Sequence, residues 1–254
     1  MLRNIKEILG YTLQARDGEI GRCRDFLFDD ENWAIRYMVA GTGKWLPGRE
    51  VLISPISVEK PEWATKRLSV KLDREQIKSA PPLKEHMPVS RHYEKKLSHH
   101  YDLPYYWVGT GLWGAHTMPP LLYPDSRGQA NAEEEQSSDN ITPKDSHLRS
   151  VKEVTGYKLE AADGGIGNIE DFIMDDQIWR VRYVVVDTGG WLPGRKVLVS
   201  PSWVDNIDWA GQRVTVDLKT DEVKNSPEYD PSEPVNQKYE LRLYDYYGRP
   251  IYKA

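Results

Sequence analysis

The chain is predicted to be mainly β, with two tandem small antiparallel β-barrels, each followed by short trailing α-helices. Three observations predict this class. The sequence repeats itself, its apolar residues alternate with polar ones over short segments, and turn-forming residues separate those segments. Short strands spaced by about ten residues are typical of small barrels. Closing each sheet would also remove the strand edges that a small sheet exposes.

An ungapped internal repeat organises the 254 residues. A shift of 146 positions, from Ile5 to Val151, aligns residues 5–106 with residues 151–252. The longest shared stretch, Trp-Leu-Pro-Gly-Arg, occupies residues 45–49 and 191–195. We therefore expect one domain at residues 1–106 and a second at 150–254. Residues 107–149 read as a linker, first aromatic, where the chain packs back onto a folded copy, and then polar and disordered.

Alternating residues predict the strands in order. In the first copy Trp33, Ile35, Tyr37 and Val39 alternate with a second set that contains Arg36, and the second copy repeats this pattern around Arg182. Residues 68–72 and 214–218 alternate in the same way. Such a period of two is typical of strands with one face on a core.

Helical patterns follow each predicted barrel. Residues 74–79 and 221–225 predict a short helix in each copy, which Pro81 or Pro227 ends. A longer amphipathic helix is predicted next, because apolar residues recur every four positions. They are Val89, Tyr93, Leu97 and Tyr101 in the first copy, and Val235, Tyr239, Leu243 and Tyr247 in the second.

Composition excludes several classes of function. The one cysteine excludes an intramolecular disulfide framework and a Cys-rich zinc site. No apolar run approaches the roughly 18 residues of a membrane-spanning helix, and the first residues contain no apolar signal segment. A net charge of −5 argues against nucleic acid as a partner. We expect a cytoplasmic protein with no integral membrane segment and no cofactor.

Several segments resemble the PRC-barrel family. They are the Asp-Gly turn at residues 17–18, the Arg-Tyr pair at 36–37 and the Trp-Leu-Pro-Gly-Arg stretch, each repeated in the second copy. The resemblance covers residues 5–79 and 151–225. It is strongest at residues 36–55 and 182–201, which resemble tandem, free-standing bacterial members. The family includes the cytoplasmic domain of the photosynthetic reaction centre H subunit and the C-terminal domain of the ribosome maturation factor. The resemblance implies an assembly or interaction module without a shared catalytic site.

Candidate chemical groups are few. His92 and His99 lie seven positions apart on the predicted helix, where they could hold a metal with one added ligand. The repeat replaces them with Lys238 and Asp245, so no histidine site is common to both copies, and we expect these histidines to be exposed and no metal to bind. The acidic residues near Asp25 read as turn residues. We therefore expect that the protein is not an enzyme.

Aromatic and arginine residues are the candidate contact sites. Large aromatic and Arg side chains are enriched in binding hot spots, and Pro restricts a loop before it docks. The candidates are Trp45, Leu46, Arg49, Trp191, Leu192, Arg195, Trp107 and Trp113. In the alternative interpretation, the tryptophans of the repeated stretch plug the mouth of their own barrel, and its arginines pair with turn carboxylates.

The predicted function is a non-catalytic interaction, assembly or regulatory role in a bacterial cytoplasm, with a protein partner or a second copy of the chain. One alternative is a small-ligand or metal-binding sensor with a pocket between the two barrels. Another is a peripheral component of a membrane-associated electron-transfer complex, by analogy with the H subunit.

Overall fold

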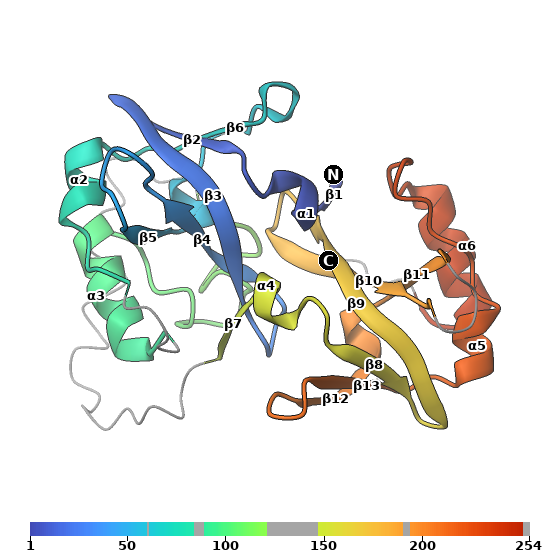
Figure 1. Ribbon diagram of the computed structural model, residues 1–254. Helices are drawn as coiled ribbons and strands as arrows, with labels where there is room; N and C mark the ends of the chain where they lie inside the picture. Colours follow the sequence, from blue (N-terminus) through green and yellow to red (C-terminus); the bar gives the residue numbers. More distant parts are fainter. Residues whose placement is uncertain (60, 84–88, 121–146, 190–193, 251–254) are drawn as a thin grey trace. The chain divides into compact units, whose positions relative to one another are not determined.

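The computed structural model describes residues 1–59, 61–83, 89–120, 147–189 and 194–250. Within these residues the chain is mainly β and contains two sheets, which confirms the predicted class. Figure 1 shows the elements along the chain. Among the described residues, no helix is long and apolar enough to cross a membrane.

The chain folds into two compact units that do not follow the boundaries of the repeat. Unit 1 consists of Met1–Glu7, Val151–Asp176 and Arg180–Ala254. Unit 2 consists of Ile8–Ser150 and Gln177–Trp179. The first seven residues therefore belong with the second copy, and the residues just before position 151 belong with the first. Most of the linker expected at 107–149 lies outside the described residues.

The sheet of unit 2 has the strand order β5-β4-β3-β2-β6, and β7 pairs with β3. All of its pairs are antiparallel except β2 with β6, which is parallel. The strands are β2 (Thr12–Ala15), β3 (Gly18–Asp29), β4 (Ile35–Gly41), β5 (Glu50–Ile53), β6 (Arg67–Ser69) and β7 (Leu148–Ser150).

The sheet of unit 1 repeats this arrangement in the order β11-β10-β9-β8-β13-β12, and β1 pairs with β9. Its parallel pair is β13 with β8. The strands are β1 (Leu2–Asn4), β8 (Lys158–Ala161), β9 (Gly164–Asp175), β10 (Arg180–Asp187), β11 (Lys196–Val199), β12 (Val204–Asp208) and β13 (Arg213–Val216).

Two details of the predicted sheets differ from the structure. Within the described residues neither strand order returns to its first strand, so closure into a barrel is not observed. The sheets are also not wholly antiparallel, because β2 and β8 each have a parallel neighbour. The strands of a parallel pair are far apart in sequence, so the short-range alternation that predicts a strand carries no information about this neighbour.

Alternate residues of the long strands fill the cores. In β3 the side chains of Phe26 and Phe28 are fully buried, and in β9 that of Phe172 is. Each such burial contributes about 1.5–3 kcal/mol. Strand β4 departs from the alternation, because all of its residues are buried, Arg36 included.

The two strands that follow the Asp-Asp turns begin later than predicted. Trp33 and Trp179 were expected inside them, but both lie in the turn, with φ angles of 58° and 54°. Strand β4 begins at Ile35 and β10 at Arg180. Both tryptophans are nevertheless buried, so they add to the core from the turn.

The predicted helices are present in both units. In unit 2, the N-cap Ser90 accepts a hydrogen bond from the Tyr93 amide at the start of the longer helix. The Tyr93 hydroxyl donates to the Pro81 carbonyl, and Tyr239 donates to Pro227 in unit 1. These helices are α2 (Arg74–Ser79), α3 (Arg91–Tyr101), α5 (Thr220–Lys224) and α6 (Gln237–Tyr247). One-turn helices not predicted from the sequence are α1 (Ile5–Ile8) and α4 (Val151–Val154), together with 3-10 turns at Pro55–Ser57, Trp63–Thr65 and Pro201–Trp203.

The short strands β1 and β7 occupy equivalent places in the two units. In unit 1, Arg3 Nε lies 2.7 Å from an Asp176 carboxylate oxygen. In unit 2, Arg149 Nε lies 3.0 Å from an Asp30 carboxylate oxygen, at the position related to the first by the repeat. Each strand therefore adds to a long strand of the other copy through the same ion pair.

Candidate interaction site

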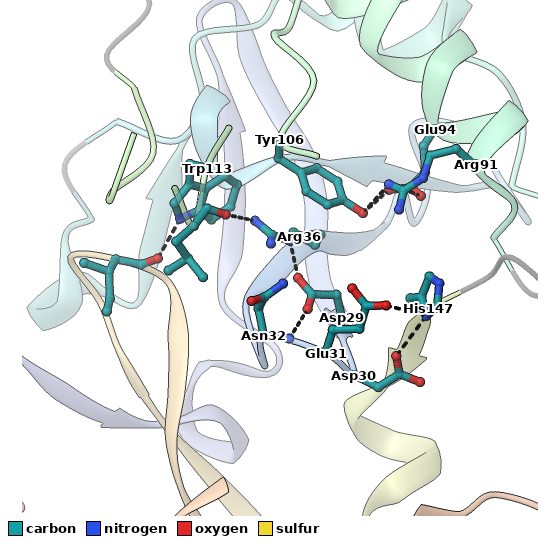
Figure 2. Close-up of polar contacts among 12 residues, drawn as sticks. Asp29, Asp30, Glu31, Asn32, Arg36, Arg91, Glu94, Tyr106, Trp113 and His147 are labelled. Carbon is teal, nitrogen blue, oxygen red and sulfur yellow. Dashed lines mark hydrogen bonds and ion pairs between the residues drawn. The ribbon is translucent and has the colours of Figure 1, made fainter. Parts of the chain in front are cut away.

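A cluster of charged and aromatic side chains covers the outer face of β4 in unit 2. Strand β4 supplies Arg36, and α3 supplies Arg91 and Glu94. The segment after α3 supplies Tyr106 and Trp113. Figure 2 shows these side chains converging above the strand. The aromatic half of the predicted linker thus packs onto a folded unit, as expected.

Arg36 lies at the centre of this cluster and is 2% exposed. Its guanidinium carbon is 3.9 Å from the Tyr106 ring centroid and 4.9 Å from that of Trp113. Its Nε donates to Asp29, and its Nη1 donates to the Leu112 carbonyl at 2.6 Å (Figure 2). These two rings, the carboxylate and the carbonyl offset the cost of burying the Arg36 guanidinium.

Glu94 is the second buried charge of the cluster, also at 2% exposed. It accepts a hydrogen bond of 2.6 Å from the Tyr106 hydroxyl and lies 3.2 Å from Arg91 Nη1. Burial raises the pKa of its carboxyl, while Arg91 and the hydrogen bonds from Tyr106 and Tyr37 oppose that rise. Burial likewise raises the pKa of Tyr106 well above its ordinary value. These groups are used to hold one another in place.

The outer edge of the cluster is aromatic and reaches the surface. Tyr105 and Trp107 stack with their ring centroids 4.6 Å apart, and both are half-buried. The Arg91 guanidinium lies 4.2 Å from the Trp107 ring centroid. Val108, the next residue, is 37% exposed. This edge is a rigid apolar surface, because its rings are stacked on an arginine that is itself held by Glu94.

Trp113 lies at the buried end of the same segment. It is 2% exposed, and its indole N–H donates to the Ile178 carbonyl at 2.8 Å within unit 2 (Figure 2). Of the predicted contact residues, Trp113 is therefore buried within unit 2, whereas Trp107 reaches the surface of that unit.

Unit 1 contains the same pair of charges in a simpler setting. Arg182 and Glu240 correspond to Arg36 and Glu94, and their nearest charged atoms are 3.6 Å apart. The Tyr183 hydroxyl donates to Glu240 at 2.7 Å. The side chains of Arg182 and Glu240 are 12% and 19% exposed. Tyr252, which corresponds to Tyr106, lies outside the described residues.

The repeated Trp-Leu-Pro-Gly-Arg stretch forms a turn between β4 and β5 in unit 2. The Thr42 hydroxyl lies within hydrogen-bond distance of the Leu46 and Arg49 carbonyl oxygens, at 2.6 and 2.7 Å. Trp45 and Leu46 are half-buried, and the Trp45 ring centroid is 4.8 Å from the Arg74 guanidinium carbon. The structure therefore fixes this turn and leaves part of both apolar side chains at the surface.

The arginine of each stretch has a structural partner. Arg49 donates to the carbonyl of Ala80, just after α2, and Arg195 donates to that of Ser226, just after α5. The alternative interpretation paired these arginines with turn carboxylates, but the structure pairs them with backbone carbonyls. Trp191 and Leu192 lie outside the described residues.

In the described part of the chain, no three His, Cys, Asp or Glu side chains are placed to hold a metal ion. The turn carboxylates near Asp29 serve local contacts, since Asp29 also accepts the Asn32 amide. His147 lies 3.4 Å from Asp30 and 3.5 Å from Glu31 (Figure 2). Sequence reasoning missed the cluster around Arg36, although its aromatic residues were noted.

Comparison with known families identifies the domain. Residues 151–223 match the PRC-barrel domain. This segment contains strands β8 to β13 and most of α5. The second copy of the repeat therefore contains a PRC-barrel domain. No curated protein matches the chain.

Proposed function

We propose that the chain is a non-catalytic interaction module, with a PRC-type fold in both copies, that binds a protein partner through surface aromatic side chains. The observation that carries this proposal is the turn of residues 42–49 in unit 2. It holds Trp45 and Leu46 at the surface on a backbone that is fixed by its own hydrogen bonds.

A turn of this kind favours binding for two reasons. Tryptophan contributes large contact area with few rotatable bonds and is enriched in binding hot spots. A backbone already held in one conformation also loses less entropy when a partner docks. The Arg74 guanidinium beside Trp45 and the anchor from Arg49 to Ala80 both limit movement before binding.

The stacked pair Tyr105 and Trp107 supports the same proposal. These rings form a second rigid apolar surface in unit 2, and Arg91 holds Trp107 in place. In this proposal the PRC-type copies hold the contact residues in place. The partner binds to the turns of the repeated Trp-Leu-Pro-Gly-Arg stretch and to the segment after α3. The buried polar groups of the cluster are engaged with one another, which supports a role without catalysis.

The test is affinity purification of the full-length chain from its native cells, with Trp45→Ala compared with the wild type. Trp63→Ala is the matched control, because Trp63 is also half-buried and lies on a different loop of unit 2, where its ring centroid is 6.2 Å from that of Tyr11. We expect the wild type and Trp63→Ala to retain a stoichiometric partner. We expect Trp45→Ala to bind that partner at least tenfold more weakly, a loss of about 1.4 kcal/mol.

Thermal unfolding of each variant checks that the fold is kept. The proposal is contradicted if Trp45→Ala retains the partner fully, or if the wild type recovers no stoichiometric protein.

A further inference from the structure

Unit 1 contains a pocket, which Trp45, Leu46, Tyr105 and Trp107 do not line. Its volume is about 220 Å³, and it is lined by residues from β1, α1, β9, β10, β11 and the loop before α6. The lining residues used below are Asn4, Lys6, Asp171, Val185, Lys196 and Tyr229. The proposed function makes no use of this pocket.

A buried carboxylate, that of Asp171, lines this pocket. Asp171 is 7% exposed. Its Oδ1 accepts the backbone amides of Phe172 at 2.7 Å and Lys6 at 3.0 Å. Within the described residues, Oδ2 accepts no hydrogen bond. Because Asp171 lines the pocket, a ligand there that carries an N–H group can donate to Oδ2 without displacing a donor of the protein.

The equivalent carboxylate in unit 2, that of Asp25, has the hydrogen-bond donor that Asp171 Oδ2 lacks among the described residues. Asp25 accepts the Phe26 amide on Oδ1, and its Oδ2 accepts the hydroxyl of Ser150. The position of Ser150 is taken in unit 1 by Asn4. The side-chain oxygen of Asn4, Oδ1, accepts a hydrogen bond of 2.9 Å from the Tyr229 hydroxyl. Ser150, which donates to the second oxygen of Asp25, is therefore replaced in unit 1 by Asn4, whose side-chain oxygen accepts a hydrogen bond from Tyr229.

Charge in the pocket favours a monovalent cation. Lys196 Nζ lies 2.6 Å from Glu170 Oε1, and Lys6 Nζ lies 3.8 Å from the same oxygen. Glu7 also lines the pocket, so three carboxylates face two ammonium groups. These carboxylates are not grouped closely enough to hold a metal ion, since no three His, Cys, Asp or Glu side chains of the described residues are placed to do so. An organic cation is therefore the better match. Val185 and the Tyr229 ring offer apolar contact to its carbon atoms.

We propose that this pocket binds a small organic ammonium ion, whose N–H donates to Asp171 Oδ2. A charge-assisted hydrogen bond in a buried place is stronger than one between neutral groups. Burial raises the pKa of the Asp171 carboxyl to about 6. Below that pH the carboxyl is neutral and loses its attraction for a cation, so binding weakens as the pH falls through this value. Lys6, Lys196, Glu7, Glu170 and Tyr229 are the other titratable groups that face the pocket.

The test is an NMR titration of the full chain with n-butylammonium chloride, and with 1-butanol as the neutral probe. At pH 7.5 we expect saturable shifts of the Lys6 and Phe172 amides with the ammonium ion and not with the alcohol. At pH 5 the carboxylate is about one-tenth ionised, so we expect roughly tenfold weaker binding.

Three variants locate the site. Asp171→Asn keeps the oxygen that accepts the two amides and should weaken binding at least tenfold. Asp25→Asn, its match in unit 2, should leave binding unchanged. Asn4→Ser introduces in unit 1 a hydroxyl at the position that Ser150 has in unit 2. This hydroxyl should donate to Asp171 Oδ2 and so weaken binding of the ammonium ion. Equal shifts with 1-butanol, the absence of a saturable shift, or full binding by Asp171→Asn would each overturn the proposal.

Discussion

At the scale of single residues, the structure shows why a buried charge is tolerated in β4. Arg36 is surrounded by Asp29, two aromatic rings and the Leu112 carbonyl, so little of its hydrogen-bonding capacity is lost. Removing one member of such a group leaves the others buried without a partner, and this penalty is larger than the worth of the contact itself.

The first prediction concerns Arg36→Met, which keeps much of the side-chain volume and removes the charge. We expect the free energy of unfolding of unit 2 to fall by about 3 kcal/mol, because the Asp29 carboxylate loses its buried partner. Urea unfolding followed by tryptophan fluorescence measures the change. Arg182→Met is the matched control, and its effect should be smaller, since Arg182 and Glu240 are more exposed. Equal losses in the two variants would contradict the role given to the covering aromatic segment.

At the scale of elements, the long strands β3 and β9 share a close approach to their neighbours. A Cβ atom added at Gly21 would lie 2.0 Å from the Gly41 carbonyl oxygen, and one at Gly167 would lie 2.0 Å from that of Asp187. Gly21 also has a φ of +136°, which side chains rarely adopt. The repeated glycine therefore allows the paired strands to approach at this point.

The second prediction follows from this contact. Gly21→Ala should destabilise unit 2 by at least about 2 kcal/mol, because backbone must move to admit the methyl group. Gly165→Ala is the control, since it adds the same methyl group in β9, where nothing lies within 4 Å. Thermal or urea unfolding of both variants measures the difference. A Gly21→Ala chain as stable as the Gly165→Ala chain would show that the strands separate there at little cost.

The same scale shows how far the sequence predicts the structure. The helix Arg74–Ser79 and the main strands follow from periodicity, because their core faces are determined by nearby residues. The burial of Arg36 does not, since its cover comes from Tyr106 and Trp113, about seventy positions later. The pocket at Asp171 was missed for a similar reason, because Asn4 and Asp171 meet only after folding. Strands β1 and β7 have three residues each, too few for a periodic signal.

At the scale of the whole molecule, each unit is assembled from both copies of the repeat. Unit 1 includes Met1–Glu7, and unit 2 includes Gln177–Trp179 and the strand β7. The two copies are similar enough that β1 could pair with either long strand, so local sequence does not determine which it joins. The observed exchange means that cutting the chain once between the copies leaves every sheet with strands from both fragments.

The third prediction tests this exchange. A protease site inserted between Arg127 and Gly128 lets the folded chain be cut into two fragments. We expect the fragments to remain together as one species in native mass spectrometry and gel filtration, because β1 stays in the sheet of unit 1 and β7 in that of unit 2. Unfolding in urea should release them.

The cut wild-type chain is compared with a cut double variant, Arg3→Pro with Arg149→Pro. Proline removes a backbone donor from each short strand, and the change also removes both ion pairs, to Asp176 and to Asp30. The cut double variant should therefore separate at concentrations where the cut wild type does not. Before any cut is made, hydrogen exchange should become faster at Met174, which lies opposite Arg3, and at Asp176, whose amide donates to the Met1 carbonyl. If the cut wild type separates as readily as the double variant, the exchanged strands do not hold the two copies together.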